Sequence, residues 1–229
     1  MVRTVMANTI GECWLECIRQ VSLFGDVSFD EDVDLKEILG LTVRINRPAL
    51  FDAIIDKLGD KSIVAHTLDK FEKGVVMNNR PFTYADCIYN KNGVDQFEWI
   101  VNRLINKPES KSASICLLKE GDSNANLPCL IALDAKIRCN KLNLQFFFRS
   151  QNIVGRQYAN LLALANLQYK LAKRLSVEVG FMSGYISSAH IYSYDYDFAK
   201  AVCEGIETKL SDEFYIKGPM SIRNNNLFR

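Results

Sequence analysis

The sequence predicts an α+β fold with a mainly antiparallel or mixed sheet and packed helices, in a single domain over residues 1–229. Segments with the helical period of 3.6 residues and segments with strand-like alternation follow one another without a strict β–α–β order. The hydrophobic fraction of 48% is enough to form a sizeable core. We find no internal repeat, linker or low-complexity segment, so one domain is the simplest prediction.

The charge balance excludes one class of partner. Lys and Arg number 28 and Asp and Glu number 27, which gives a net charge of +1. Binding a nucleic-acid polymer requires a clustered basic surface, whereas a small phosphorylated ligand requires only a few cations. The chain has no run of 18 apolar residues and no secretory signal pattern, so we expect no membrane span and a cytoplasmic location.

The cysteine pattern indicates neither a metal site nor a disulfide framework. The number of cysteines is odd and no Cys-x-x-Cys pair occurs. We therefore expect free, mostly buried thiols in a reducing cytosol and no bound metal. The seven cysteines are Cys13, Cys17, Cys87, Cys116, Cys129, Cys139 and Cys203.

The N-terminal third begins with a predicted helix from Thr9 to Gly25. Its apolar residues recur at three- and four-residue steps, and Thr9 with Glu12 forms a capping box. The acidic stretch Asp26–Asp34 is expected to be a surface loop. A strand is predicted over Leu35–Asn46, where apolar residues alternate loosely.

The middle of the chain carries weaker signals. Pro48 is predicted to open a second helix, with Leu50 and Phe51 on its apolar face. An irregular stretch is expected from Thr83 to Gly93. Val94–Ile105 then has the apolar spacing of a helix.

The C-terminal half predicts the centre of the fold. The expected elements are a buried strand at Ser112–Leu118, strands at Leu130–Cys139 and Leu142–Arg149, a helix at Tyr158–Leu175, a strand at Val177–Tyr192 and a helix at Phe198–Lys209. The two strands joined by Asn140-Lys141 are expected to form a hairpin. The helix at Tyr158–Leu175 is apolar over most of its circumference, so it should be central.

Cys129 differs in context from the other cysteines. It follows Pro128 directly before a predicted strand, where a thiol can be exposed, whereas Cys116 and Cys139 lie inside strand patterns. A nucleophilic thiol requires a lowered pKa, which a nearby guanidinium can supply. If the hairpin folds in simple register, Arg149 comes close to Cys129. From spacing alone, a structural thiol remains the alternative, and Arg149 could equally bind a phosphate.

Three further polar residues have both a structural and a functional interpretation. Asn160 lies in the first turns of an apolar helix, where an amide can cap or pack, or can read the edge of a uracil ring. His190 and Tyr192 are two residues apart in a strand and so point to the same face. They are either core polar groups bonded to the backbone or ligands of a sugar hydroxyl.

Four short motifs follow one another in this half. Arg149 comes 20 residues after Cys129, Asn160 comes 11 after Arg149, and His190 comes 30 after Asn160. The order and spacing resemble the thymidylate synthase family, in particular its shorter archaeal-type members. There a Pro-Cys motif is followed by Arg-Ser-x-Asp, an asparagine on a helix, and His-x-Tyr. The likeness extends more thinly toward the N-terminus, through Tyr84.

The resemblance implies a catalytic chemistry. Cys129 would be the nucleophile that adds to carbon 6 of a pyrimidine ring, which makes an enolate at carbon 5. That carbon would attack a one-carbon unit from 5,10-methylenetetrahydrofolate. Arg149 would lower the pKa of Cys129, and Tyr84 resembles the active-site tyrosine of the family, although Ala85 replaces the glycine that follows it.

The resemblance also implies a nucleotide site and a homodimer. Arg149 and Ser150 would bind the phosphate of the pyrimidine nucleotide. Asn160 would distinguish uracil from cytosine, and His190 and Tyr192 would bind the sugar hydroxyl. In this family each subunit of the homodimer lends phosphate-binding arginines to the other.

Several positions depart from the family pattern. Asn152 replaces the aspartate that contacts the folate pterin, and Asn cannot ionise. Arg156 and Tyr158 replace a glycine and a proline in the loop before the helix. Lys111 and Ser112 replace the two arginines lent across the dimer, which leaves Lys111 as the expected phosphate ligand. The family segment with the catalytic glutamate has no clear match.

The first functional hypothesis is one-carbon (methyl) transfer to carbon 5 of a uridine-type nucleotide, converting deoxyuridine monophosphate (dUMP) to the thymidine nucleotide. A hydroxymethylase, or a specialised-metabolism relative with an altered cofactor site, is the second. The third is a nucleotide-binding homologue without turnover. The changes at Asn152, Arg156 and Tyr158 favour the second, and the missing arginines and glutamate favour the third.

Overall fold

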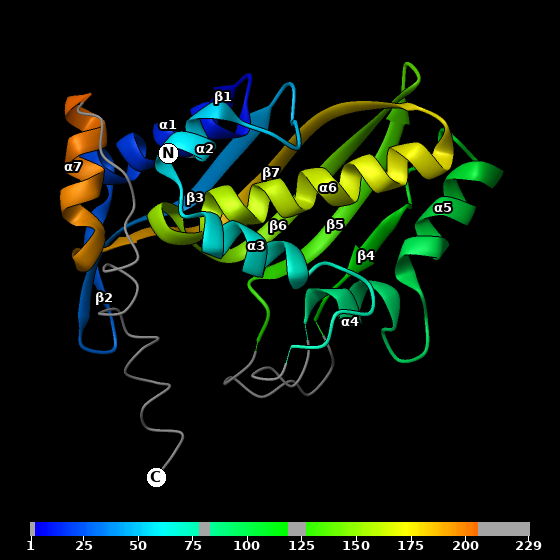
Figure 1. Ribbon diagram of the computed structural model, residues 1–229, viewed down its shortest axis with the longest axis horizontal. Coiled ribbons are helices and arrows are strands. Elements are labelled where there is room, and N and C mark those ends of the chain that lie inside the picture. Colours follow the sequence, from blue (N-terminus) through cyan, green and yellow to red (C-terminus); the bar gives the residue numbers. More distant parts are fainter. Residues whose placement is uncertain (1–2, 78–82, 119–126, 206–229) are drawn as a thin grey trace, which may run out of the picture.

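The computed structural model describes residues 3–77, 83–118 and 127–205. The strands are β1 (Arg3–Ala7), β2 (Asp26–Asp30), β3 (Val33–Ile45), β4 (Ser114–Cys116), β5 (Leu130–Arg138), β6 (Lys141–Asn152) and β7 (Glu178–Tyr192). The α-helices are α1 (Ile10–Phe24), α2 (Ala53–Leu58), α3 (Lys61–Asp69), α4 (Tyr84–Tyr89), α5 (Gln96–Asn106), α6 (Tyr158–Leu175) and α7 (Tyr196–Glu204) (Figure 1). A π-helical turn (Ile153–Gln157) joins β6 to α6, and a 3-10 turn (Ser193–Asp195) joins β7 to α7.

The seven strands form one mixed sheet in the order β1-β3-β7-β6-β5-β4, with β2 also paired to β3. The β1–β3 and β6–β7 pairs are parallel, and the other neighbours are antiparallel. The chain passes through α6 between β6 and β7, because parallel neighbours require a crossover connection. The predicted α+β class with a mixed sheet is confirmed.

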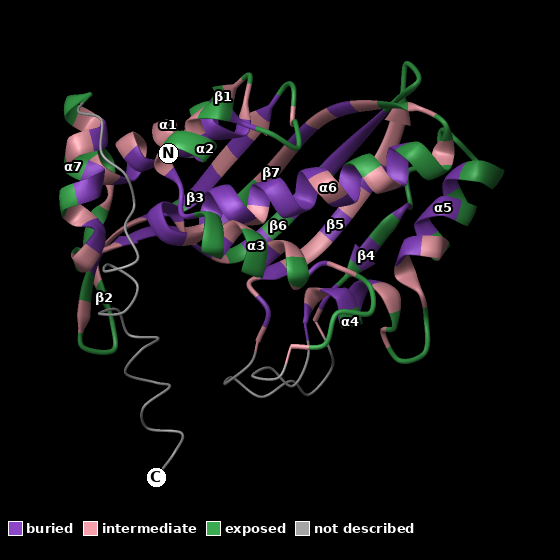
Figure 2. Ribbon diagram, viewed as in Figure 1, coloured by how far each residue is buried: buried purple, intermediate pink, exposed green. Residues whose placement is uncertain are grey.

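Helix α6 is the centre of the helical layer, as its all-round apolar character predicted. It contacts β6 and β7, and α3, α5 and α1 pack against it (Figure 1). Most of its length is buried (Figure 2). At its N-terminal end the Trp14 ring of α1 lies 4.6 Å from the Tyr158 ring, and the Trp14 Nε1–H donates to the Ile153 carbonyl at 3.0 Å. Trp14 therefore fixes the π-helical turn that follows β6.

In the three central strands, the alternating pattern of buried side chains shifts by one residue at one level of the sheet. Leu41, Ile186 and Phe148 pair across β3, β7 and β6, and all three are buried. Three residues further along, Ile38, Ala189 and Gln151 also pair with one another and are also buried. Side chains in a regular strand alternate between faces, so a step of three exchanges the faces. Gly40, with φ +81°, lies at this level of β3 and adopts a left-handed conformation that favours glycine.

The other face of the sheet carries large apolar side chains in contact with solvent. Phe147 and Tyr185 pair across β6 and β7, with ring centroids 5.8 Å apart and exposures of 36% and 41%. Met6 on β1 is 66% exposed and pairs with Arg44, which stacks on Phe181. Exposed apolar surface that is continuous across several strands is typical of an interaction face.

The structure corrects several predicted elements. The acidic stretch Asp26–Asp34 is a β-hairpin rather than a loop, because backbone pairing between β2 and β3 satisfies a segment that is exposed on both faces. The second helix begins after Asp52 rather than at Pro48, and Leu50 and Phe51 are exposed. The Asp52 carboxylate accepts from the amides of the first turn of α2 and from that of Gly11, a contact that sequence alone does not reveal.

Two smaller corrections concern the turn before β6 and the segment after residue 83. The hairpin turn consists of Cys139 and Asn140, both with positive φ, rather than of Asn140 and Lys141. Two left-handed central residues give a turn that matches the twist of a hairpin. The segment expected to be irregular contains helix α4, capped by Thr83 and Asp86. The part of the last predicted helix beyond residue 205 lies outside the described residues.

No helix among the described residues is long and apolar enough to cross a membrane.

Substituting Trp14→Phe is expected to lower the free energy of unfolding by about 1–3 kcal/mol. The change leaves the buried Ile153 carbonyl without its donor while most of the aromatic volume is kept. Urea unfolding followed by circular dichroism measures the difference. The matched control is Trp99→Phe, because Trp99 is 41% exposed, and its effect should stay within ~0.5 kcal/mol. Equal losses in the two variants would contradict this account.

Candidate active site

The β5–β6 hairpin brings Arg149 against the segment that carries Cys129, as its predicted register implied. The Arg149 backbone N–H donates to the Cys129 carbonyl at 2.9 Å. The Arg149 guanidinium donates to the carbonyls of Pro128 at 3.0 Å and Leu127 at 2.9 Å. The cation is therefore held against the backbone of the segment that carries the half-buried Cys129, and its effect on the thiol pKa stays a prediction.

Tyr84 reaches the same segment from α4. Its hydroxyl accepts from the Leu130 N–H at 3.4 Å, directly after Cys129, and its ring packs 4.7 Å from that of Phe71. The predicted trio of Cys129, Arg149 and Tyr84 is thus assembled from three separate parts of the chain.

The exposure argument that set Cys129 apart is wrong. Cys116 and Cys139 are exposed, and Cys129 is only partly exposed. Cys116 lies on the short edge strand β4, and Cys139 lies in the hairpin turn, so neither is covered by the core. The feature that distinguishes Cys129 is its cationic neighbour rather than its accessibility.

Strand pairing brings the nucleotide-binding candidates into adjacent rows. In the parallel β6–β7 pair, Ser150 lies opposite Ser188 and Asn152 lies opposite His190. The His190 and Tyr192 rings meet edge to face with centroids 4.9 Å apart, which is consistent with their predicted common face. Ser150 directly follows Arg149, so these paired residues of β6 and β7 lie next to the segment that carries Cys129.

Asn160 contacts the residue of β6 between Ser150 and Asn152, which the sequence analysis missed. Its Nδ2 lies 3.4 Å from Oε1 of Gln151, which is only 3% exposed. The change of phase in β6 turns Gln151 toward α6, and no local pattern in the sequence indicates that turn. Gln151 thus constrains the orientation of the amide proposed to read the base.

Asn152 and Arg156, both partly buried, form a polar cluster with the buried Asp195 after the ends of β6 and β7. The Asn152 Oδ1 accepts from the Gly155 N–H at 2.8 Å and caps the π-helical turn. The Asn152 side chain lies close enough to the Asp195 carboxyl to lower its pKa, and the Asp195 Oδ2 has no hydrogen-bond partner among the described residues. Burial raises the pKa of Asp195 to about 7, against the opposing effects of Arg156 and Asn152.

A second set of hydrogen-bonded polar side chains holds His190. The Ser188 hydroxyl donates to Glu37 on β3, and the Ser188 Oγ lies 3.3 Å from Nδ1 of His190. Burial lowers the pKa of His190, while the charges of Glu37 and Asp30 raise it in part. Two residues after His190, the Tyr192 hydroxyl donates to Asp30 at 2.7 Å.

Lys111 is not brought to Cys129 within one chain. In the antiparallel β4–β5 pair, Ser114 lies opposite Asp134 and Cys116 lies opposite Ala132. Lys111 precedes Ser114 and so lies beyond Asp134, on the side away from Cys129. At about 3.3 Å per residue, the distance along β5 from Cys129 to Asp134 alone is roughly 17 Å.

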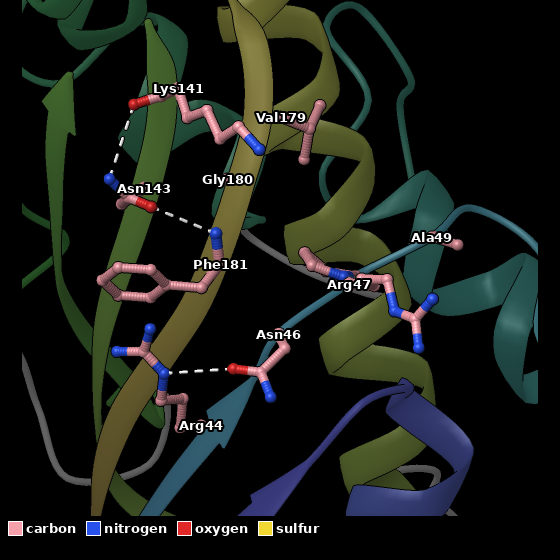
Figure 3. Close-up of a pocket in the computed structure, with 10 residues that line it drawn as sticks. Arg44, Asn46, Arg47, Ala49, Lys141, Asn143, Val179, Gly180 and Phe181 are labelled. Atoms are coloured by element: carbon pink, nitrogen blue, oxygen red, sulfur yellow. Dashed lines mark hydrogen bonds between the residues drawn. The ribbon is translucent and has the colours of Figure 1, made fainter. Parts of the chain in front are cut away.

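A cavity of about 380 Å³ opens elsewhere, at the starts of β6 and β7, whereas the candidate site lies near the ends of these strands. Part of its polar lining is engaged internally (Figure 3). The Arg44 guanidinium stacks on the Phe181 ring and donates to Asn46, and Asn143 accepts from the Phe181 N–H. Among the described residues, no group of three or more His, Cys, Asp or Glu side chains could hold a metal ion.

Comparison with known proteins identifies the family. The family model described as thymidylate synthase matches residues 28–225. The chain belongs to the thymidylate synthase family. Members of this family bind a pyrimidine nucleotide, so membership indicates a transferase of nucleotide biosynthesis.

Curated archaeal relatives cover nearly the whole chain. A protein of Methanosarcina mazei is 29% identical over 208 residues, which is 89% of this chain and 96% of the relative. A protein of Methanosarcina acetivorans has the same identity and coverage. One from Methanothermobacter marburgensis is 27% identical over 219 residues, 88% of this chain and 98% of the relative. Each of the three carries the name "Putative thymidylate synthase". The predicted resemblance to archaeal-type thymidylate synthases is confirmed.

The buried Asp195 is expected to make stability fall as the pH rises. The folded state holds the Asp195 proton more tightly than the unfolded chain does, since the pKa is about 7 when folded and ~3.9 when unfolded. The stabilising effect is complete below about pH 4 and is lost as the pH rises through 7. Relative to Asp195→Asn, the wild type should lose about 2 kcal/mol between pH 5.5 and pH 8.5.

Urea unfolding at the two pH values tests this expectation. The matched control is Asp197→Asn, because Asp197 is exposed on α7, and it should follow the wild type. The same pH dependence in the wild type and in Asp195→Asn would show that Asp195 does not titrate in this range.

Proposed function

We propose that the protein transfers a one-carbon unit to carbon 5 of a uridine-type nucleotide through a covalent adduct with Cys129. The observation that carries this proposal is the Arg149 guanidinium bonded to the Leu127 and Pro128 carbonyls beside Cys129. One cation is thereby fixed where it can stabilise a thiolate and also bind a phosphate.

The residues around this pair suit a pyrimidine nucleotide. Arg149 and Ser150 are assigned to the phosphate, because both lie at the same end of β6. Asn160, oriented by Gln151, is assigned to the uracil edge, where an amide offers both a donor and an acceptor. His190 and Tyr192 are assigned to the sugar. These roles follow the resemblance, and the strand pairing supports them.

The proposed reaction begins with attack of the Cys129 sulfur on carbon 6 of the ring. A sulfur–carbon bond forms while the electron pair of the ring double bond moves to carbon 5 and the adjacent carbonyl oxygen, giving an enolate. After carbon 5 has gained the new carbon, loss of its proton lets the carrier amine depart from that carbon, and for a methyl product a hydride must then reach it as the thiolate is expelled and the ring double bond is restored. Tyr84, fixed near Cys129, is the candidate to relay that proton.

The cofactor expected from the family is 5,10-methylenetetrahydrofolate, which would supply the one-carbon unit when bound and, by its own oxidation to dihydrofolate, the hydride that a methyl product requires. Asn152 is the residue assigned to it. Because Oδ1 accepts from Gly155, Asn152 has its amide N–H to offer. That N–H fits a carbonyl of the cofactor, and the orphaned Asp195 Oδ2 adds acceptor capacity next to it.

We propose that the protein is a homodimer. The exposed Phe147 and Tyr185 on the sheet face provide an apolar surface, and Arg149 is exposed at the border of that face. Since Lys111 lies away from Cys129 in its own chain, a second copy would have to supply it to the phosphate. A dimer through this face would therefore complete the site.

A hydroxymethylase is the second candidate, and one cluster favours it. Asn152 cannot act as an ionised carboxylate, and Arg156 and Asp195 place two further polar groups close to it. Polar groups near carbon 5 of the nucleotide would suit the addition of water to the new carbon. Product mass separates the two reactions.

Incubating the protein with dUMP and 5,10-methylenetetrahydrofolate should yield a methylated nucleotide by mass spectrometry. Cys129→Ser should lower the rate by ~10³-fold or more, because the serine hydroxyl is a far weaker nucleophile than a cysteine thiolate at neutral pH. The matched control is Cys116→Ser, which replaces an exposed thiol on β4 and should keep full activity.

A hydroxymethylated product would support the second candidate. Absence of any product and of a Cys129–nucleotide adduct, with dUMP still bound, would replace the enzymatic proposal by a nucleotide-binding role. Equal losses in Cys129→Ser and Cys116→Ser would remove Cys129 from the mechanism.

A further inference from the structure

Three polar side chains in mutual contact link β3 to β7 next to the proposed sugar site. Glu37 lies opposite His190 in the antiparallel β3–β7 pair, and Ser188 is two positions before His190 on the same strand. The Ser188 hydroxyl donates to Oε1 of Glu37, and its oxygen lies 3.3 Å from Nδ1 of His190. Two paired strands hold these contacts, so the geometry does not depend on a flexible loop.

The number of available hydrogens decides the direction of each bond. A serine hydroxyl has one hydrogen and an ionised carboxylate has none, so the Ser188 hydrogen is committed to Glu37. The Ser188 oxygen can then only accept from His190, which requires a proton on Nδ1. A neutral imidazole with its proton on Nδ1 has a lone pair on Nε2. None of the hydrogen bonds among the described residues uses Nε2.

We infer that Glu37 and Ser188 are positioning residues that hold His190 in the tautomer protonated on Nδ1, so that Nε2 accepts a hydrogen bond from a hydroxyl of the bound ligand. The identity of that ligand rests on the proposed function. The site then selects a nucleotide whose sugar hydroxyl is free, because a sugar that lacks this hydroxyl or carries a phosphate on it has no hydrogen to donate.

The surroundings of His190 are consistent with a neutral ring. Burial lowers its pKa, and the charge of Glu37 on β3, a backbone hydrogen bond with Ser188 and the charge of Asp30 on β2 oppose this only in part. On its other side, β6 presents the uncharged Asn152. Tyr192 donates its own hydrogen to Asp30, so the neighbouring hydroxyl is also oriented by a carboxylate.

The tautomer can be observed directly, because the chain contains only 2 histidines. Two-bond proton–nitrogen correlation spectra of protein labelled with ¹⁵N-histidine distinguish the protonated from the unprotonated ring nitrogen. His66→Gln assigns the signals, since His66 is on α3. The expected result at pH 7.5 is a single His190 species with its proton on Nδ1. A proton on Nε2, or an averaged mixture, would overturn the inference.

Two variants test whether Glu37 and Ser188 cause this preference. Ser188→Ala should convert the single species into a mixture of tautomers, and Glu37→Gln should shift the population in the same direction. The matched controls are Ser187→Ala, on the adjacent position of β7, and Asp34→Asn, on the exposed start of β3. Both controls should keep the wild-type spectrum. An unchanged tautomer in both Ser188→Ala and Glu37→Gln would refute the positioning role.

Calorimetry then tests the consequence for the ligand. The probes are dUMP and 2′,3′-dideoxyuridine monophosphate, which lacks the sugar hydroxyl. Removing the hydroxyl should weaken binding ~10-fold in the wild type and in Ser187→Ala but only about two-fold in Ser188→Ala, because the acceptor is no longer fixed. Equal effects in all three proteins would refute the selection argument. If dUMP binds to none of them, the proposed function fails, while the spectra still decide the tautomer.

Discussion

The candidate site depends on the change of buried face that occurs at one level across β3, β7 and β6. A regular strand would present alternate residues to the helices along its whole length. The step from Ile186 to Ala189 breaks this alternation, and neighbouring strands make the same step, so backbone pairing continues. Beyond it, Gln151 turns toward α6 and meets Asn160, whereas Ser188 is left to face Glu37. One backbone irregularity thus orients polar groups on both sides of the sheet.

Segments that carry their own signals were predictable from the sequence. Helix α6 was found with its observed limits because its apolar surface is continuous, and α1 because Thr9 and Glu12 cap it locally. The start of α2 was not predictable, because its capping residue Asp52 is fixed by a hydrogen bond from the Gly11 N–H of α1, which is distant in sequence. The hairpin of β2 was missed since strand pairing, not burial, stabilises a segment that is exposed on both faces.

The same distinction applies to the site. The closeness of Cys129 to Arg149 follows from a hairpin register, and the common face of His190 and Tyr192 follows from a period of two. Gln151 and Glu37 were not found, because their roles arise from contacts between elements. Glu37 and Ser188 are 151 positions apart in sequence, and each is unremarkable in its own strand. Only the tertiary fold reveals that they act on His190.

The asparagine at position 152 and the aspartate at position 195 are best understood as one coupled pair. An aspartate at 152, as the family pattern has it, would place a second carboxylate against Asp195, whose pKa burial already raises to about 7. Like charges at hydrogen-bond distance in a buried site cannot both ionise, so one would stay protonated. The neutral amide avoids this repulsion and still accepts from Gly155. Asn152 therefore keeps the cap of the π-helical turn, with Asp195 as the acidic group beside it.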